Sequence, residues 1–371
     1  MGERKLTVEG MVTMLQDLQN TYKGKKVFLT GHTGFKGAWL LKMLNILGAE
    51  VKGFALAPQY ENDLYNLIGG DLLCESVIAD LRNRDVLTTA IIDFQPDFIF
   101  HLAAQPLVRL SYEMPSQTFE INAIGTANLL DAVRRLKKKC SVVLITTDKV
   151  YHNNEWEYPY RETDKLGGYD PYSASKACTE LVIDSYRNSF FNPLNYSDHS
   201  KALAVCRAGN VIGGGDWSAN RLIPDIIGSL YSNNPVAVRN PKSVRPWQFV
   251  LEPLLGYLML GAKIEQSVIY AEAYNFGPDV SDTLPVLEMV DLAIKNWGMG
   301  SYVFLNSDKE LHEAGLLKLD SSKSIARLNW KPKYSAATAI EVTINWYKEF
   351  YENPRQIATY SANQILSFVN A

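Results

Sequence analysis

A tyrosine and a lysine four residues apart, Tyr172 and Lys176, are the strongest candidates for acid–base chemistry in this sequence. In a helix, side chains at this spacing lie on one face. A nearby ammonium group favours a phenolate and lowers a tyrosine pKa that starts near ~10. Tyr172 could then take the proton of an alcohol while a hydride leaves the same carbon. By itself, the spacing is also typical of a tyrosine and a lysine on a protein surface. The surrounding elements must therefore show whether the pair is catalytic.

A polar segment, Thr146 to Lys149, follows the nearly all-apolar run Ser141 to Thr146. Such a run is typical of a strand buried on both faces, and open α/β sheets place their chemistry at the carboxyl ends of strands. Thr147 could hydrogen-bond a reacting hydroxyl, while Asp148 and Lys149 could supply an acid and a base. Without Tyr172 and Lys176, polar loop residues leaving a sheet would explain the segment equally well.

A glycine-rich turn at residues 31–37 predicts a dinucleotide site, since it follows one predicted strand and opens a helix. Its glycines, Gly31, Gly34 and Gly37, would let the backbone approach a pyrophosphate at the helix N-terminus. A generic strand-to-helix turn is the alternative. The predicted cofactor contacts in this turn are Gly31, Thr33, Gly34, Phe35, Lys36 and Gly37.

The remaining cofactor contacts are predicted where later strands end. The second strand ends without a carboxylate or an arginine, so we expect NAD and do not exclude NADP. Asp80 could bind the adenine amino group or cap the next helix. Small residues after His101 would let a flat cofactor pass close to the sheet. The further predicted contacts are Asp80, Leu81, Ala103, Ala104, Gln105, Asn122, Thr146, Tyr172 and Lys176.

Strands alternate with helices over residues 23–207, which predicts a Rossmann-like, doubly wound parallel sheet of the α/β class. The expected strands are 26–30, 50–56, 76–79, 97–102, 141–146 and 201–207, and the expected helices are 35–47, 118–136 and 171–187. Asp170 should cap the last of these helices, with Pro171 at its first position. Residues 208–371 should form mostly a smaller substrate-binding lobe, with helices at 251–263, 284–297 and 336–351. Segments within about 240–275 should return to the first domain. Residues 1–22 read as an extension carrying a short amphipathic helix.

The composition excludes several classes of partner. Among 371 residues the formal net charge is −3, which gives no reason to expect nucleic acid or an anionic membrane surface. No apolar run is long enough to span a bilayer, and residues 1–22 lack the apolar core of a signal peptide, so we expect a cytoplasmic protein. The cysteines and histidines are scattered, which predicts reduced thiols and no metal site.

Three segments together identify a family resemblance. Thr147-Asp148-Lys149, the run from Gly209 to Trp217 and the run from Arg245 to Pro253 resemble the nucleotide-sugar 4,6-dehydratases of the extended short-chain dehydrogenase/reductase family. The resemblance extends from about Lys23 to the C-terminus. Members that act on thymidine-diphosphate-glucose carry Thr-Asp-Glu at the first segment, so Thr-Asp-Lys implies CDP-glucose here. One departure is Phe249, where a histidine would be expected.

The resemblance implies a sequence of steps. Tyr172 takes the C4 hydroxyl proton as hydride passes from C4 to NAD⁺, the ketone acidifies C5–H, water leaves across C5–C6, and hydride returns to C6. Asp148 is the candidate acid and Lys149 the candidate base or enolate stabiliser. Asn210, Arg221 and Arg245 lie where the family binds the sugar diphosphate. Helices 118–136 and 171–187 would pair with their copies, giving a homodimer or a dimer of dimers.

Two other functions compete with this one. A 4-epimerase would share Tyr172, Lys176 and the glycine turn, but it needs no acid and base at C5–C6. A non-catalytic, cofactor-sensing protein should have lost the Tyr172–Lys176 pair.

Overall fold

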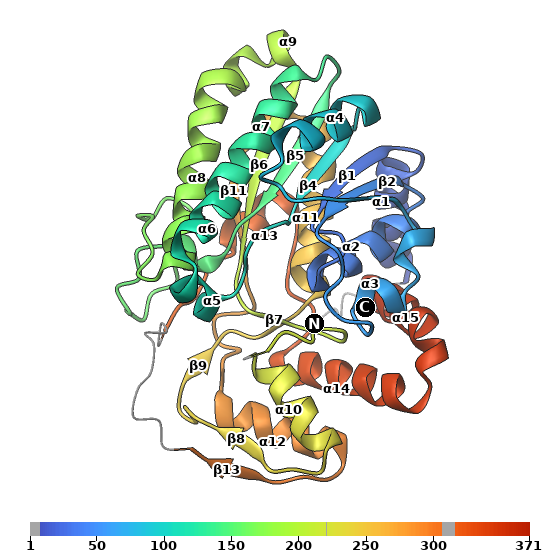
Figure 1. The fold of residues 1–371 in the computed structure, drawn as a ribbon, viewed down its shortest axis with the longest axis vertical. Helices are drawn as coiled ribbons and strands as arrows, with labels where there is room; N and C mark the ends of the chain where they lie inside the picture. The colour runs from blue at the N-terminus through green and yellow to red at the C-terminus, as the bar shows by residue number, and fades with distance from the viewer. Residues whose placement is uncertain (1–7, 220, 306–315) are drawn as a thin grey trace, which may run out of the picture.

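A computed structural model describes residues 8–219, 221–305 and 316–371 of the chain. Its centre is a seven-stranded sheet in the order β11-β6-β5-β4-β1-β2-β3, in which every neighbouring pair is parallel. The strands are β1 (Lys26–Thr30), β2 (Glu50–Ala55), β3 (Glu75–Ile78), β4 (Phe98–His101), β5 (Cys140–Ile145), β6 (Lys201–Ala208) and β11 (Ala273–Phe276). The predicted α/β class and doubly wound parallel sheet are therefore confirmed (Figure 1).

The seventh strand, β11, was not among the expected strands. It is short, and its polar Asn275 breaks the apolar run that marks the other buried strands. It joins the sheet because helix α11 (Leu251–Gln266) packs along β5 and β6 and delivers the chain to the open edge of β6. There Ala273 pairs with Val205 and Phe276 with Ala208.

Helices cover both faces of the sheet, because alternate residues of a strand point to opposite sides. Val27 and Leu29 pack into one core, while Phe28 between them packs into the other. The first face is covered by α2 (Phe35–Ile46), α11, α1 (Val8–Tyr22) and α15 (Ile357–Asn370). The second is covered by α4 (Arg84–Phe94), α7 (Gly125–Arg135) and α8 (Pro171–Phe190).

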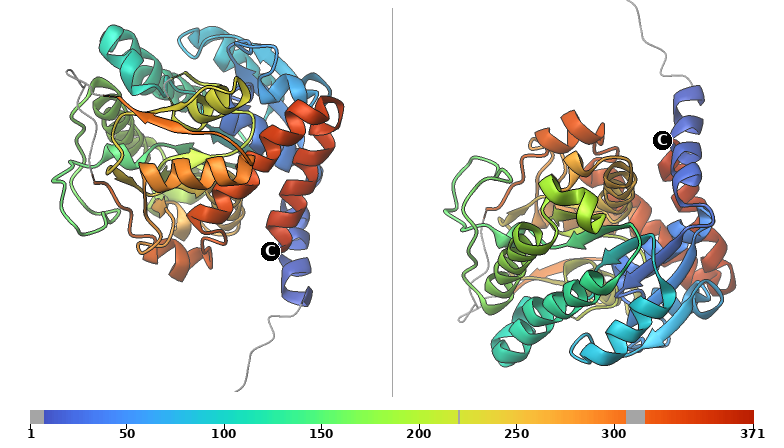
Figure 2. Two further views of the ribbon diagram at one scale, coloured as in Figure 1. Left: turned by 90° about the horizontal axis from the view of Figure 1, so that it is seen from below. Right: turned by 90° about the horizontal axis from the view of Figure 1, so that it is seen from above.

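The expected N-terminal helix is present as α1, which lies along α15 and α11 (Figure 2). Its C-terminal end is part of the core, since Leu18 and Tyr22 are buried and the Tyr22 hydroxyl donates to the Leu258 carbonyl at 2.7 Å. The first seven residues of the predicted extension lie outside the described residues.

Two helices that carry predicted site residues differ slightly from expectation. The helix expected at 118–136 consists of α6 (Pro115–Phe119), a π-helical turn η2 (Glu120–Ile124) and α7. A π-helical turn is frequent at functional sites, and this one contains Asn122. Helix α8 begins as predicted, because the Asp170 carboxylate accepts from the Ser173 amide at 2.9 Å and Pro171 follows the cap.

The C-terminal half adds a smaller lobe below the carboxyl ends of the strands (Figure 1). Its elements are α10 (Leu222–Tyr231), α12 (Val286–Trp297), α14 (Ala336–Glu352) and the two-residue or three-residue strands β7 (Val211–Ile212), β8 (Val236–Val238), β9 (Val244–Arg245), β10 (Gln248–Phe249), β12 (Leu284–Pro285) and β13 (Tyr302–Phe304). Helix α13 (Ser322–Leu328) returns to the sheet and packs against β11 and α11. Short helices complete the chain: α3 (Leu64–Leu67), η1 (Gly70–Leu72), α5 (Val108–Glu113), η3 (Asp148–Val150), η4 (Pro193–Asn195), α9 (Tyr196–His199), η5 (Val268–Tyr270) and η6 (Pro354–Gln356). Within the described ranges, no helix combines the length and the apolar character needed to cross a membrane.

Candidate active site

The glycine turn between β1 and α2 has the shape that a dinucleotide needs. Gly31 has a φ of +75°, and a Cβ there would lie 2.8 Å from the Ala103 nitrogen of the neighbouring strand end. A Cβ on Gly37 would overlap the Gly31 carbonyl, so Gly37 holds α2 against the turn. At Gly34 a Cβ would meet only the Gly31 oxygen at 3.5 Å, and no side chain caps the helix there. The first amides of α2 are thus left open to an anion, which fits a pyrophosphate.

Two neighbours of the turn have structural partners. The Thr33 hydroxyl donates to the Leu56 carbonyl at 2.8 Å, so it fixes the turn against the end of β2. Asp80 does not cap α4, which corrects one of the two expectations for this residue: the cap is Asn83, which accepts from the Val86 amide. Asp80 instead pairs with Arg82 at 2.7 Å, and this bond lowers the pKa of Asp80. Its contact with adenine stays a prediction.

Lys36 points from the turn into the interior of the protein. Its ammonium donates to the Tyr257 hydroxyl of α11 at 2.9 Å. Burial lowers the pKa of Lys36 to about 8, and the charges of Arg221, Lys176 and Asp148 act on it in opposing directions. The Lys36 side chain is therefore part of the protein interior next to the candidate site. Only its backbone amide lies in the open first turn of α2, where a cofactor would bind.

Tyr172, Thr147 and Asp148 come together as predicted from the order of the elements. Tyr172 lies in the first turn of α8, and Thr147 and Asp148 follow β5. Burial raises the pKa of Tyr172 to about 12, and a hydrogen bond with the Thr147 hydroxyl lowers it in part. The Thr147 hydroxyl also lies 3.0 Å from a carboxylate oxygen of Asp148. All three side chains are buried, as a site that excludes water requires.

Lys176 is anchored to the strand that carries this segment. Its Nζ donates to the Ile145 carbonyl at 3.0 Å, at the last residue of β5. Burial lowers the pKa of Lys176 to about 8, and the Glu180 carboxylate raises it. Lys149 lies in the short helix η3 and is half-buried. Its role as a base is not tested by this geometry and stays a prediction.

Asn122 ties the fourth strand end to α8. Its Oδ1 accepts from the Gln105 amide at 2.8 Å, and its Nδ2 donates to the Ser175 hydroxyl at 2.8 Å. Gln105 in turn donates to the Thr118 hydroxyl at 3.0 Å. Both ends of the Asn122 amide are thus used within the protein, and its place is at the joint between the cofactor strand and the catalytic helix. Leu81 is buried, and Ala103, Ala104 and Phe35 are half-buried around this edge of the sheet.

Sequence reasoning missed two buried charged residues behind the catalytic pair. Glu180 is the third member of a Tyr172, Lys176, Glu180 series with helical spacing, and that series was a signal in the sequence. Arg207 is the next-to-last residue of β6 and follows the apolar run 202–206, so a charge there needs a partner. The Arg207 guanidinium binds the Glu180 carboxylate through two nitrogens, at 2.9 and 2.8 Å.

The predicted substrate residues lie on the side of the second lobe. Arg221 pairs with Asp216 at 3.0 Å, and its charge lowers the pKa of Tyr172, which places it within electrostatic range of the phenol. Asn210 is half-buried, and its carbonyl accepts from the Gln248 amide at 3.3 Å. The backbone of Arg245 forms β9 and pairs with Leu284. Contacts of these residues with a sugar diphosphate stay predictions.

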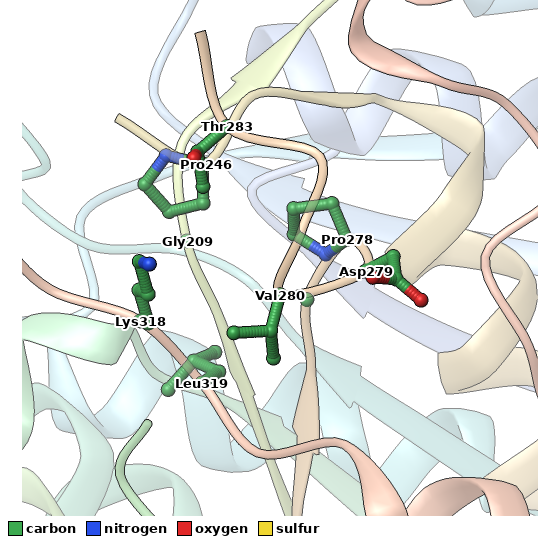
Figure 3. Close-up of a pocket in the computed structure, with 9 residues that line it drawn as sticks. Gly209, Pro246, Pro278, Asp279, Val280, Thr283, Lys318 and Leu319 are labelled. Atoms are coloured by element: carbon green, nitrogen blue, oxygen red, sulfur yellow. The ribbon is translucent and has the colours of Figure 1, made fainter. Parts of the chain in front are cut away.

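A small pocket lies near the carboxylate of Asp148, with Gly209 next to both. Gly209 forms part of its wall, and a Cβ there would lie 3.0 Å from Asp148 Oδ2. Figure 3 shows the apolar side chains of Pro246, Pro278, Val280 and Leu319 around it, together with the polar Thr283, Asp279 and Lys318. The lining residues are Gly209, Pro246, Gly277, Pro278, Asp279, Val280, Thr283, Lys318 and Leu319.

The departure at Phe249 has a packing explanation. Its side chain is buried, lies against the ring of Tyr334 with centroids 5.8 Å apart, and meets Phe368 of α15 at the same distance. A histidine would put an unpartnered polar ring among these aromatics, so phenylalanine suits the position.

Among the described residues, no group of three or more histidine, cysteine, aspartate or glutamate side chains could hold a metal ion. The four cysteines are unpaired with one another.

Comparison with known proteins defines the class and then the family. The chain matches the GDP-mannose 4,6 dehydratase family model over residues 28–343. It is 46% identical to the CDP-glucose 4,6-dehydratase of Salmonella typhimurium, over 89% of this chain and 92% of that protein. It is 27% identical to the CDP-paratose 2-epimerase of Salmonella typhi, over 86% of this chain and 98% of that protein.

Solved structures agree on the fold. A dTDP-glucose 4,6-dehydratase double mutant from Streptomyces venezuelae, determined with NAD bound, superposes with a TM-score of 0.73 at 23% identity, covering 87% of this chain and 97% of that one. An epimerase from Methanothermobacter thermautotrophicus gives a TM-score of 0.77 at 22% identity, covering 93% and 98%. The family model and the 46% identical relative place the chain among the extended short-chain dehydrogenases/reductases. Within this class, the chain belongs to the nucleotide-sugar 4,6-dehydratases.

Proposed function

We propose that this enzyme converts CDP-D-glucose into CDP-4-dehydro-6-deoxy-D-glucose with NAD as its cofactor. The observation that carries the proposal is the meeting of Thr147, Asp148 and Tyr172 in one buried cluster where β5 ends. The 46% identical relative, a CDP-glucose 4,6-dehydratase, supports the choice of substrate.

The cofactor fits the open first turn of α2, between Gly31 and Gly37. NAD⁺, when bound, accepts a hydride from C4 of the sugar and returns it to C6. The end of β2 offers neither a carboxylate for a ribose hydroxyl nor an arginine for a 2′-phosphate, so NADP is not excluded. The NAD found with the Streptomyces relative supports NAD.

Tyr172 acts first, as the base that takes the C4 hydroxyl proton. Its phenol pKa of about 12 in the free protein is too high for an efficient base at neutral pH. The Thr147 hydroxyl and a charged Lys176 must therefore favour the phenolate when substrate is bound. Thr147 is placed to do this by its hydrogen bond with Tyr172, and Lys176 by its position one helical turn away on α8.

Asp148 and Lys149 act on the other half of the reaction. Oxidation at C4 acidifies the hydrogen on C5. Lys149 removes this proton or stabilises the enolate, and Asp148 protonates the departing C6 hydroxyl, so that water leaves and an enone forms. Asp148 is buried and lies close enough to Tyr172 to act on its phenol, which suits an acid that serves the same bound sugar. Asn210, Arg221 and Arg245 would hold the diphosphate, since guanidinium groups bind phosphate oxygens in pairs.

The direct test is incubation of the purified protein with CDP-glucose and NAD⁺, followed by alkali. A 4-keto-6-deoxy sugar develops ultraviolet absorbance under these conditions. We expect the absorbance with CDP-glucose and much less with dTDP-glucose or GDP-mannose. Equal rates with all three would contradict the choice of CDP-glucose, and CDP-galactose as the product would favour the epimerase.

We also propose a homodimer formed by α7, α8 and their copies, or a dimer of such dimers. Ile124, at the end of η2 just before α7, is 55% exposed, and Leu181 on α8 is 60% exposed, although both are large and apolar. A second copy related by a two-fold axis would cover both of them. We propose a cytoplasmic location for this nucleotide-sugar enzyme.

A further inference from the structure

Glu180 lies directly behind the catalytic pair. Tyr172, Lys176 and Glu180 follow one another at four-residue steps along α8, so they share one face of the helix. Glu180 is 3% exposed. Its Oε1 also accepts a 2.6 Å hydrogen bond from the hydroxyl of Thr146, the residue between β5 and the Thr147–Lys149 segment. The carboxylate thus touches the strand end that carries the other proposed catalytic groups.

Arg207 holds this carboxylate from the neighbouring strand. It is 4% exposed, and its Nε and one terminal nitrogen bind the two oxygens of Glu180. Its other terminal nitrogen donates to the Tyr151 hydroxyl at 2.9 Å and to the Glu162 carbonyl at 3.0 Å. Tyr151 comes two residues after Lys149. One guanidinium therefore joins β6, α8 and the chain that leaves the catalytic segment.

The Glu180 carboxylate favours the charged form of the buried Lys176. Lys176 is buried, and its Nζ hydrogen bond goes to the neutral Ile145 carbonyl. The titratable groups that face it are Glu180 on α8, His101 on β4 and Lys36 on α2. Burial and the charge of Lys176 lower the pKa of His101 to about 3, so this ring is neutral. The positive charge of Lys36 disfavours a positive charge on Lys176, whereas the Glu180 carboxylate favours it.

We propose that Glu180 and Arg207 are positioning residues for the reaction: the Glu180 carboxylate keeps Lys176 charged, and Arg207 fixes that carboxylate against Thr146. The inference rests on the proposed function, because the pair acts on catalysis through Lys176 and Tyr172. Arg207 is needed because a lone buried carboxylate would be strongly destabilising, whereas a bidentate partner satisfies both of its oxygens.

The proposal predicts a particular change in pH dependence. A charged Lys176 stabilises the Tyr172 phenolate, so turnover should fall as pH rises through the pKa of Lys176. Removing the Glu180 carboxylate lowers this pKa. The alkaline fall in turnover should then begin at lower pH, while a residue that only supports the fold would reduce turnover similarly at every pH.

The test is the pH profile of kcat for Glu180→Gln, with CDP-glucose and NAD⁺ at saturation. Glutamine keeps the size of the side chain and can still accept from Thr146. We expect the alkaline limb to move down by about one pH unit, and kcat above that limb to fall about tenfold. Glu180→Asp, which keeps the charge, should restore the position of the limb. Glu252→Gln removes another buried carboxylate, at the start of α11, and should leave the limb in place.

A double-mutant cycle checks that the effect passes through Lys176. In Lys176→Met, adding Glu180→Gln should change kcat by less than about twofold. Independent, additive effects would overturn the proposal. Because Glu180→Gln leaves Arg207 with a lone buried charge, the double variant Glu180→Gln/Arg207→Gln is made as well, and it should show the same shifted limb.

Each remaining outcome decides the question. If both variants fold and the limb stays where it is in the wild type, the pair has no such role. If both variants unfold at 25 °C, the pair serves the fold and the proposal is wrong. Wild-type protein that converts no CDP-glucose at any pH would contradict the proposed function instead, so the two failures are distinguishable.

Discussion

The Nζ of Lys176 donates to the carbonyl of Ile145 at 3.0 Å, which fastens the catalytic helix to the last residue of the fifth strand. The next residues along the chain are Thr146, Thr147 and Asp148. Together with the hydrogen bond from the Thr146 hydroxyl to Glu180, this bond holds the end of β5 against α8. The site depends on this junction, because Tyr172 and Thr147 come from two different elements and must still share a hydrogen bond.

Tyr172→Phe should abolish turnover and leave the fold unchanged. The substitution removes one hydroxyl, and general-base catalysis contributes typically ~10²–10⁴-fold. The measurement is the initial rate of CDP-glucose conversion, with far-ultraviolet circular dichroism and NAD binding as controls for folding. A variant that keeps more than about a tenth of the wild-type rate would show that Tyr172 is not the base.

Two glycine variants should separate folding from cofactor binding. Gly37→Ala should destabilise the protein by several kcal/mol, because its Cβ would overlap the Gly31 carbonyl. Gly34→Ala should fold, since its Cβ makes only an ordinary contact, but it should weaken NAD binding because the methyl group enters the space proposed for the pyrophosphate.

The control for both glycine variants is Gly228→Ala. Its Cβ meets nothing within 4 Å in the interior of α10, so its free energy of unfolding should be equal to or slightly above the wild type. Chemical denaturation measures all three variants, and calorimetry measures NAD binding. A stable Gly37→Ala variant, or a Gly34→Ala variant with unchanged NAD affinity, would contradict the geometry described for the turn.

The buried His101 should make stability fall in mild acid. Burial and Lys176 lower the pKa of His101 to about 3 in the folded protein, against about 6.5 in an unfolded chain. Between these values only the unfolded state takes up the proton. The free energy of unfolding therefore falls as pH decreases below about 6.5, by up to ~1.4 kcal/mol per pH unit for this group.

His101→Asn isolates this effect from other titrating groups. His32, whose pKa burial lowers to about 4, acts in the same direction, whereas Glu252, whose pKa burial raises to about 7, acts in the opposite one. These two groups are common to the wild type and the variant, so their contributions cancel in the difference. We expect that difference in unfolding free energy to shrink between pH 7 and pH 5. Parallel curves would mean that the pKa of His101 is the same in the folded and unfolded protein, which contradicts the lowered value.

Leu181→Glu should convert the proposed dimer into monomers. The side chain is 60% exposed in the single chain, and a charge there would be buried against its copy across a two-fold interface. Light scattering at micromolar concentration measures the mass. Leu72→Glu, at a 91% exposed position outside α7 and α8, should stay dimeric. A wild-type monomer would remove the proposal altogether.

Much of the fold was predictable, because its signals are local. The first six strands lie within about two residues of their expected ends, since buried parallel strands read as short apolar runs between turns. The start of α8 was also predictable from local residues, because Asp170 caps the helix and Pro171 occupies its first position. The strand β11 carries no such local signal, because its place is fixed by the packing of α11 on the far side of the sheet.

The site residues were predictable where they lie within one helix or at one strand end. They were less predictable where contacts between distant parts of the chain determine the position of a side chain. Tyr172 and Lys176 could be paired from one helix, and Thr147 and Asp148 from one strand end. That Lys36 would turn inward to Tyr257 depends on α11, more than two hundred residues along the chain. The Glu180–Arg207 pair likewise joins a helix to a strand, and only half of it had a periodic signal.

The most direct test of the central claim follows one hydrogen atom. CDP-[4-²H]glucose is converted in ordinary water, and the position of deuterium in the product is read by nuclear magnetic resonance and mass spectrometry. A 4,6-dehydratase that uses Tyr172 at C4 and Asp148 with Lys149 at C5–C6 predicts a 4-keto-6-deoxy product with deuterium at C6. Deuterium found at C4 of a sugar that keeps its C6 hydroxyl would show epimerisation and contradict the account.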